Sequence, residues 1–363
     1  MLDYFFFLFC FLSFFNIKVK GIDNFFFDYM ELENTNSIKG IFVWLIIFCH
    51  KNKYGIKKRF IYKIITKNLG QKVVSLFLFY SSYGIYESRK KKGLNYVKTL
   101  PFKGLVLFLK FQIILLMFLI TNVFILKKKI SLKVYFLSFI FKSALGNSNW
   151  FAFSIIIFYL YSYLSFSLVK DKTFIGIIFI NIICLLHIKF VYTFFYPKAL
   201  YAVDTVLCFI FGFYFSSIKF YFDRFIMKSD IYYFGSISVL IFLYYKYYYE
   251  YNLLYNSMKN VLFAFLVIII SMKVKFSNDF LKFLNSHSYS IYLLQRLVML
   301  IVYKKHIFQN SYFIQISFEF TLIFFISSLF DKYTSFINTF FRKRNLKDIK
   351  MKNIYNSENQ SLK

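Results

Sequence analysis

Two residues near the start of the chain have the types and the spacing that acid–base chemistry on an elongated substrate needs. Lys39 and His50 are separated by eleven positions, and the residues between them are almost entirely apolar. In a helix this spacing is nearly three turns, so both side chains share one face, about 16 Å apart. Imidazole is the side chain best suited to accept a proton from a hydroxyl near neutral pH. The pair therefore suggests that Lys39 binds a phosphate or carbonyl of the substrate and that His50 acts as a base farther along the same helix face. The spacing leaves open an alternative without catalysis, in which His50 lies at the membrane interface and Lys39 is an ordinary lysine flanking the helix.

Sequence motifs for several other chemistries are absent. The chain has only 16 acidic residues and contains no H-E-x-x-H, no glycine-rich phosphate loop, no G-x-S-x-G and no paired carboxylates within an apolar run. This disfavours a metalloprotease, an NTPase and a transporter built on buried carboxylates. The four cysteines lie in apolar runs without C-x-x-C spacing, so neither a metal site nor a disulfide framework is expected.

The elements that position Lys39 and His50 are predicted to be transmembrane helices. Hydrophobic residues make up 59% of the 363-residue chain, and long uncharged runs recur from end to end. A bilayer core of about 30 Å needs roughly 20 apolar residues per helix, and runs without alternation exclude a β-barrel. We predict an all-α, polytopic membrane protein with about ten core spans: 38–50, 71–86, 104–126, 149–169, 173–192, 199–218, 231–250, 258–273, 286–303 and 312–330. The apolar stretch 130–145 is either an interfacial amphipathic helix or a further span.

The strong positive charge is interpreted as a membrane feature. The net charge is +30, and most Lys and Arg residues lie in short connections between apolar runs. Orientation by the positive-inside rule and attraction to anionic lipid explain this pattern without nucleic acid. The loops on the side of the N-terminus carry somewhat more basic residues than the loops on the opposite side. This favours a protein of the bacterial cell membrane with both termini on the cytoplasmic side. The lipid bilayer is thus the expected partner, and the oligomeric state is left open.

Five stretches in order resemble acyltransferase family 3, polytopic enzymes that acylate extracytoplasmic sugars. The first is the Lys39-x10-His50 element, and the second is LFLFYSSYGIYESRKKKG, from Leu76, with a turn similar to S-G-Y-G. The third is Asn147–Phe151, which is similar to N-x-x-W-F. The last two are LCFIFG over 207–212 and SHSYSIYLLQ over 286–295, similar to the family's later helices. The resemblance covers roughly residues 35–330.

This resemblance implies transfer of an acyl group, most simply acetyl, from a coenzyme A thioester to a hydroxyl of a surface polysaccharide or glycolipid. His50 would be the catalytic base. The implied substrate-binding residues are Lys39, Ser82, Tyr83, Asn149 and Trp150. The R-x-x-R pair that often follows the family's second helix is not evident, and Lys98 and Lys103 are the nearby basic candidates for donor binding. No metal is expected. The sequence also departs from the family at three single positions, where Lys39 replaces the commoner arginine, Ser82 a glycine and Gln295 a histidine.

A few other polar residues are set apart by their positions. Arg296 and Asp204 lie at membrane depth, where charge is costly and often functional. His187, His287 and His306 lie near predicted loops and are expected to be solvated.

The two ends of the chain are predicted to differ from the core domain, residues 30–335. Residues 1–29 form an apolar extension that is a poor signal peptide, and Met30 resembles a natural start, so this extension is expected to lie outside the working protein. Residues 336–363 form a basic tail that is expected to be disordered.

Two other kinds of protein compete with the enzyme. A flippase or transporter of lipid-linked glycans would show internal symmetry and interrupted helices, and no such pairing is seen. A glycan polymerase would have a large extracytoplasmic loop between late spans, whereas the longest hydrophilic loops here are early.

Overall fold

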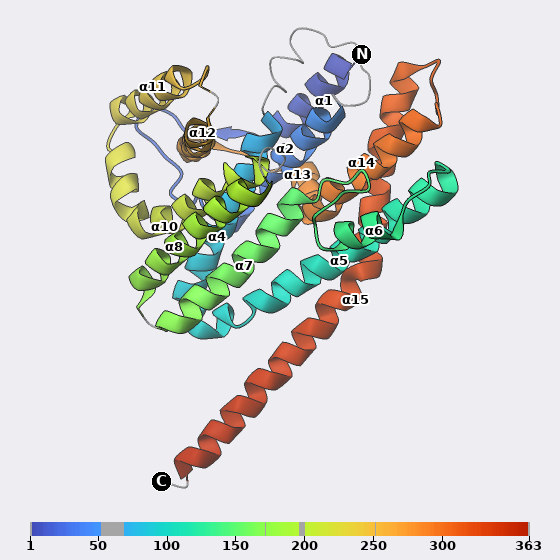
Figure 1. The fold of residues 1–363 in the computed structure, drawn as a ribbon. Coiled ribbons are helices and arrows are strands. Elements are labelled where there is room, and N and C mark those ends of the chain that lie inside the picture. Colours follow the sequence, from blue (N-terminus) through green and yellow to red (C-terminus); the bar gives the residue numbers. More distant parts are fainter. Residues whose placement is uncertain (1, 52–68, 171, 196–199, 251, 362–363) are drawn as a thin grey trace.

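Helices make up almost all of the regular structure in the computed structural model, which describes residues 2–51, 69–170, 172–195, 200–250 and 252–361 (Figure 1). The helices of the first half are α1 (Leu2–Phe14), α2 (Leu32–Lys51), α4 (Leu69–Val97), α5 (Leu100–Ile120) with a π-helical end (Thr121–Ile125), α6 (Leu132–Phe139) and α7 (Trp150–Val169). Those of the second half are α8 (Thr173–Phe195), α9 (Leu200–Val203), α10 (Val206–Ile226), α11 (Asp230–Lys246), α12 (Leu253–Lys273), α13 (Asp279–Ser286), α14 (Ser288–Lys304) and α15 (Tyr312–Ser361).

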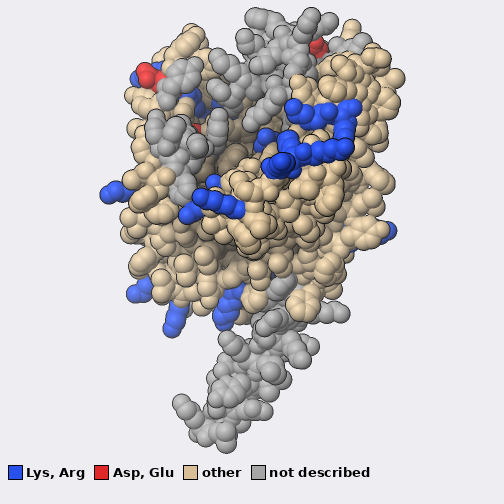
Figure 2. All heavy atoms as spheres, turned by 45° about the vertical axis from the view of Figure 1, so that its right-hand side comes forward, with Lys and Arg blue, Asp and Glu red and all other residues tan. Residues whose placement is uncertain are grey.

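Six helices within the described residues are long and apolar enough to cross a bilayer. They are Leu100–Ile125, Trp150–Val169, Thr173–Phe194, Val206–Ile226, Leu253–Lys273 and Tyr312–Ile337. Many of their large apolar side chains are exposed on the outside of the bundle, as lipid contact requires. Figure 2 shows Lys and Arg across the upper and middle parts of one face and again along its lower edge, with a band of mostly uncharged residues between the two groups. The prediction of an all-α, multi-pass membrane protein is therefore confirmed.

The other predicted spans, in the first, second, seventh and ninth positions, also contain helices, namely α2, α4, α11 and α14. Helices α2 and α4 run antiparallel, because Gly70 lies against Cys49 while Lys39 lies over the Tyr80 ring. We call the end of the bundle where α2 begins the proximal end, and the end where α2 finishes the distal end. The proximal end also contains the turn from α4 into α5.

Close helix crossings hold this bundle together at two glycines. A Cβ atom added to Gly40 of α2 would lie 2.2 Å from the backbone oxygen of Leu281 in α13. A Cβ atom added to Gly212 of α10 would lie 2.0 Å from Ser82 Oγ and 2.4 Å from the backbone oxygen of Phe79, both in α4. Only glycine permits this approach, so small residues set the interhelical distances, as in other membrane bundles.

The N-terminal segment is packed into the bundle. Phe5, Phe6 and Phe9 of α1 are buried in the main apolar cluster, and Trp44 Nε1 of α2 donates to Ser13 Oγ at 2.9 Å. Strand β1 (Lys18–Val19) pairs antiparallel with β2 (Val274–Lys275), in the register Lys18 to Lys275. Residues 2–29 therefore contact α2, α12 and α13, although the sequence suggested an extension outside the working protein.

The ambiguous stretch 130–145 contains a short helix. Helix α6 has 8 residues, which gives a length of only about 12 Å, too short for a bilayer. Leu132, Phe136 and Phe139 are exposed on it, and Lys127, Lys128, Lys129, Lys133 and Lys142 are exposed around it. These features favour the interfacial helix over a further span.

The basic tail continues the last helix of the chain. Helix α15 continues to Ser361, so residues that were expected to be disordered extend a transmembrane helix away from the bundle (Figure 1). Residues 341–361 contain no proline and no glycine, the two residues that most strongly end a helix.

Candidate functional site

A cavity of about 290 Å³ lies inside the bundle between α2, α4, α5, α7, α13 and α14. Its polar lining consists of Asn36, Lys39, Ser81, Tyr159, Asn285, Ser288, Tyr289 and Tyr292. The apolar remainder includes Leu107, Phe151 and Ile155. A few polar groups set in an apolar wall are the usual composition of a small-molecule site.

Helix α2 presents one continuous stripe to this cavity. Asn36, Lys39, Val43 and Ile46 follow the spacing of a single helix face, and all four line the cavity. The Lys39 ammonium lies 5.6 Å from the centre of the Tyr80 ring and makes no ion pair with any described residue. Lys39 therefore supplies a positive charge to the cavity wall.

His50 continues the same stripe one turn beyond Ile46, outside the residues that line the cavity. Its ring centre lies 6.1 Å from that of Tyr292, which does line the cavity. Tyr292 is 5% exposed, and its ring is 5.0 Å from the ring of Phe151. The structure thus brings Lys39 and His50 to one helix face, with the Tyr292 ring beside His50 where the cavity ends.

Beyond Tyr292 lies a second polar group that joins α14 to the loop before α7. Arg296, one turn after Tyr292, donates from Nη1 to Ser148 Oγ at 2.9 Å. The Tyr292 hydroxyl is buried and makes no hydrogen bond with the described residues. Sequence reasoning singled out Arg296 but missed Tyr292, although this tyrosine stands in the stretch SHSYSIYLLQ.

Ser82 and Tyr83 face away from the cavity. Ser82 is fully buried at the crossing with Gly212, and its hydroxyl donates to the backbone oxygen of Phe79 at 2.9 Å. Tyr83 packs with Phe215 of α10, at 6.0 Å between ring centres. The neighbouring residue Ser81 lines the cavity instead. Helix periodicity explains the shift, since adjacent residues point about 100° apart.

Asn149 and Trp150 shape the entry to α7 and are not in the cavity lining. The Asn149 amide donates to the backbone oxygens of Phe141 at 3.1 Å and Ser143 at 2.7 Å, which closes the loop before the helix. The Trp150 ring lies 6.4 Å from that of Phe151, and Phe151 is the residue of this pair that reaches the cavity.

Lys98 and Lys103 are exposed near the turn from α4 to α5, at the proximal end. The Lys103 ammonium lies 4.1 Å from the centre of the Tyr96 ring. Leu107, one turn farther along α5, lines the cavity. The two lysines are therefore close to the cavity along the chain without being part of its wall.

The three remaining histidines have different surroundings. His306 is exposed, as expected. His187 is buried in α8 and its Nδ1 lies 3.1 Å from the Tyr161 hydroxyl, which contradicts the prediction of a solvated side chain. His287 is also not fully solvated, because its side chain is 18% exposed and its Nδ1 lies 2.8 Å from Asp331 Oδ2.

The carboxylate of Asp331 joins three helices beside the cavity. It accepts hydrogen bonds from Lys110 of α5 at 2.8 Å and from Ser290 of α14 at 2.7 Å, in addition to its contact with His287. Since Ser288 and Tyr289 line the cavity, this cluster fixes the helix start that carries them. Sequence reasoning missed the cluster because its members come from distant segments.

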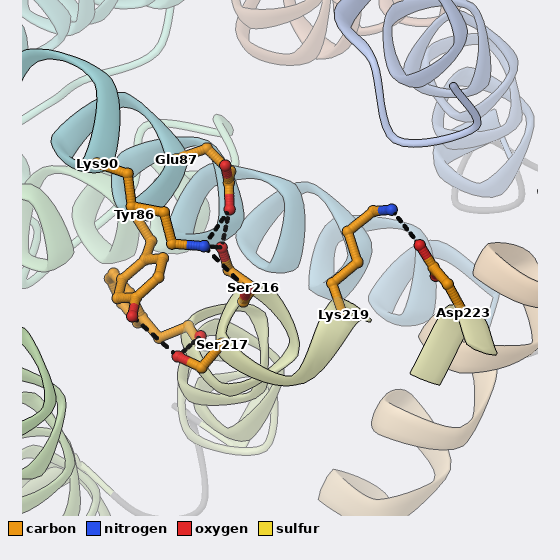
Figure 3. A network of polar contacts seen from close by, with 8 residues as sticks. Tyr86, Glu87, Lys90, Ser216, Ser217, Lys219 and Asp223 are labelled. Atoms are coloured by element: carbon orange, nitrogen blue, oxygen red, sulfur yellow. Dashed lines mark hydrogen bonds and ion pairs between the residues drawn. The ribbon is translucent and has the colours of Figure 1, made fainter. Parts of the chain in front are cut away.

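A further polar network lies between α4 and α10 toward the proximal end (Figure 3). Glu87 of α4 contacts Lys90 at 2.9 Å and accepts a hydrogen bond from Ser216 of α10. Farther along α10, Lys219 contacts Asp223 at 2.5 Å, a separate pair in the same view (Figure 3). Tyr29 donates to that carboxylate at 2.6 Å, which attaches the N-terminal segment to α10.

Asp204, the other charge at membrane depth, is 1% exposed at the junction of α9 and α10. Gln71 donates to its carboxylate, and Asn260 donates to its backbone oxygen at 3.1 Å. These bonds connect three helices at this junction. In the part of the chain that the structure describes, no three His, Cys, Asp or Glu side chains gather as a metal site would require.

No protein-family model, curated protein or solved structure matches this chain.

Proposed function

We propose that this protein is a membrane O-acyltransferase that moves an acyl group from a coenzyme A thioester to a hydroxyl of a cell-surface glycan or glycolipid. The observation that supports it best is the single stripe of α2, which offers Lys39 to an internal cavity and His50 just past its end. A cation for a carbonyl or phosphate and a base for a hydroxyl are the two groups that acyl transfer to an alcohol requires.

The topology that goes with this function has ten core spans. In chain order these are α2, α4, α5, α7, α8, α10, α11, α12, α14 and α15. An even number of spans leaves Leu32 of α2 and the end of α15 on the same side, which we assign to the cytoplasm of a bacterial cell. Lys98 and Lys103 then also lie on the cytoplasmic side, where the negatively charged donor is available.

In the proposed reaction, the donor enters from the proximal end with its phosphates near Lys98 and Lys103. Its thioester lies in the cavity, and the acceptor hydroxyl approaches from the distal end, where His50 is half-buried. His50 takes the hydroxyl proton as the oxygen attacks the thioester carbonyl. The apolar wall formed by Leu107, Phe151 and Ile155 excludes water and so limits hydrolysis of the thioester.

Mass spectrometry of surface glycans tests this proposal. Cells with the gene, without it, and with His50→Ala are compared, and His306→Ala is the matched control because His306 is exposed. We expect one acyl mass increment to disappear in the deletion and in His50→Ala, and to persist in His306→Ala. An unchanged acylation pattern in the His50→Ala strain, at normal protein level, would exclude this function.

A further inference from the structure

Tyr292 is the residue that connects the two parts of the candidate site. It lines the cavity, and its ring lies 6.1 Å from the His50 ring, centre to centre. The side chain is 5% exposed, so its hydroxyl is held in a largely dry environment. Tyr292 therefore lies beside both the cavity, where the thioester is proposed to bind, and His50, the base proposed to deprotonate the acceptor.

The Tyr292 hydroxyl is a buried donor that makes no hydrogen bond with the described residues. Arg296 follows one turn later on α14 and donates to Ser148 Oγ at 2.9 Å. The donor of the Tyr292 hydroxyl is therefore available to a ligand in the cavity, with the Arg296 cation one turn away on the same helix. A hydrogen-bond donor backed by a cation stabilises an oxyanion most strongly where water is excluded.

We propose that Tyr292 is a catalytic residue of the acyl transfer, which donates its hydroxyl hydrogen bond to the thioester carbonyl oxygen as that oxygen becomes negative. This inference rests on the proposed function. Arg296, held by its hydrogen bond to Ser148, acts as a positioning residue whose cation favours the charge that forms.

The bond changes balance as follows. The acceptor oxygen forms a bond to the carbonyl carbon, the carbonyl electron pair moves onto its oxygen beside Tyr292, and His50 accepts the hydroxyl proton. The pair then returns, the carbon–sulfur bond breaks, and the thiolate takes the proton from His50. The products are an ester and free coenzyme A, and both Tyr292 and His50 return to their starting states.

Tyr292→Phe is the sharpest test, because it removes the hydroxyl and keeps the ring that packs on Phe151. Initial rates of label transfer from radiolabelled acetyl-CoA to the endogenous glycan fraction are measured in membranes at several donor concentrations. Loss of one oxyanion donor typically lowers kcat by about 10²-fold or more. We expect a fall of that size with KM for acetyl-CoA unchanged.

Tyr161→Phe is the control for loss of a hydroxyl elsewhere in the bundle. Tyr161 is on α7, outside the cavity lining, and its hydroxyl lies 3.1 Å from His187 Nδ1. Wild-type turnover in this control is expected. A Tyr292→Phe enzyme with wild-type kcat, or with only a raised KM, would overturn the inference, as would an equal loss in Tyr161→Phe.

The outcomes also separate this inference from the proposed function. If His50→Ala retains wild-type label transfer, the acyl-transfer mechanism itself fails. If His50→Ala is inactive while Tyr292→Phe is as active as wild type, the mechanism stands and Tyr292 is only part of the cavity wall.

Discussion

Gly212 of α10 and Ser82 of α4 meet at a helix crossing so close that a methyl group on Gly212 would lie 2.0 Å from Ser82 Oγ. The same methyl group would lie 2.4 Å from the backbone oxygen of Phe79, so side-chain rotation alone cannot relieve the clash. These residues belong to two of the stretches on which the family resemblance rests. Their contact shows why a small residue is needed at each position.

Gly212→Ala is therefore expected to destabilise the protein. Overpacking of this kind costs about 1–3 kcal/mol, and the melting temperature in detergent should fall accordingly. Gly84→Ala is the matched control on α4, because a Cβ atom there would meet nothing within 4 Å. The control should be neutral or slightly stabilising, since alanine favours a helix over glycine. Equal melting temperatures for the two variants would contradict the close contact between α4 and α10 at Gly212.

A buried ion pair between Lys51 of α2 and Glu319 of α15 gives a second stability prediction. Their side chains are 5% and 3% exposed. Lys51→Met leaves a buried carboxylate without its counter-ion, which costs about 3–5 kcal/mol. Thermal unfolding in detergent should show a large loss, which the double variant Lys51→Met/Glu319→Leu should partly restore.

The control for this pair is Lys282, which contacts Glu33 at 3.5 Å with 47% and 52% of the two side chains exposed. Lys282→Met should cost no more than about 1 kcal/mol, as exposed pairs do. A loss as large as that of Lys51→Met would show that burial is not the cause.

Much of the architecture follows from the sequence, whereas side-chain partners do not. Apolar runs predicted the transmembrane helices, and the spacing of Lys39 and His50 predicted their shared face, because both depend only on local periodicity. The contact between His287 and Asp331 spans 44 positions and depends on how α14 packs on α15. Tyr292 was missed for the same reason, since only the packed bundle shows which tyrosine lies beside His50.

The N-terminal segment illustrates the same limit. Residues 1–29 have no motif that predicts a partner, and their apolar residues alone do not distinguish a leader from a packed helix. The hydrogen bond from Trp44 to Ser13 and that from Tyr29 to Asp223 depend on tertiary contacts. Ser82, by contrast, was expected in the site because the resemblance carried it there, although its helix face points toward α10.

Deletion of residues 1–29 should consequently destabilise the protein even though Met30 could begin translation. The deletion exposes the apolar surface that Phe5, Phe6 and Phe9 cover and removes the strand that pairs with β2. We expect a lower melting temperature and less monodisperse protein in detergent. A truncated protein with wild-type stability would mean that these contacts contribute nothing, and the extension could then be dispensable.

The pair of Asp28 and Lys275 predicts a pH dependence outside the membrane. Lys275, 2.5 Å away, lowers the pKa of Asp28, and Asp28 raises the pKa of Lys275. The carboxylate's contribution is present above its unfolded pKa of about 3.9 and is lost as the pH falls through its lower folded value. The ammonium's contribution is present below about pH 10.4 and is lost as the pH rises through its higher folded value.

Asp28→Asn should thus cost less than about 1 kcal/mol near pH 7, because the Asp28 side chain is 39% exposed. The difference from wild type should disappear at a pH below the folded pKa of Asp28. Melting temperatures of both proteins across a pH series measure this, and a difference that persists unchanged in strong acid would show that the ion pair is not its source.

Lys39 and Lys103 should affect the donor in different ways, because one lies in the cavity wall and the other on the exposed helix beside it. Lys39→Met removes a charge that is proposed to meet the thioester or its phosphates inside the bundle, so both KM for acetyl-CoA and kcat should worsen. Lys103→Ala removes an exposed charge, and its effect should be a raised KM with kcat unchanged. Added salt should reduce the Lys103 effect more than the Lys39 effect, since exposed charges are screened more strongly. Identical salt dependence for the two variants would contradict the difference in burial on which this prediction rests.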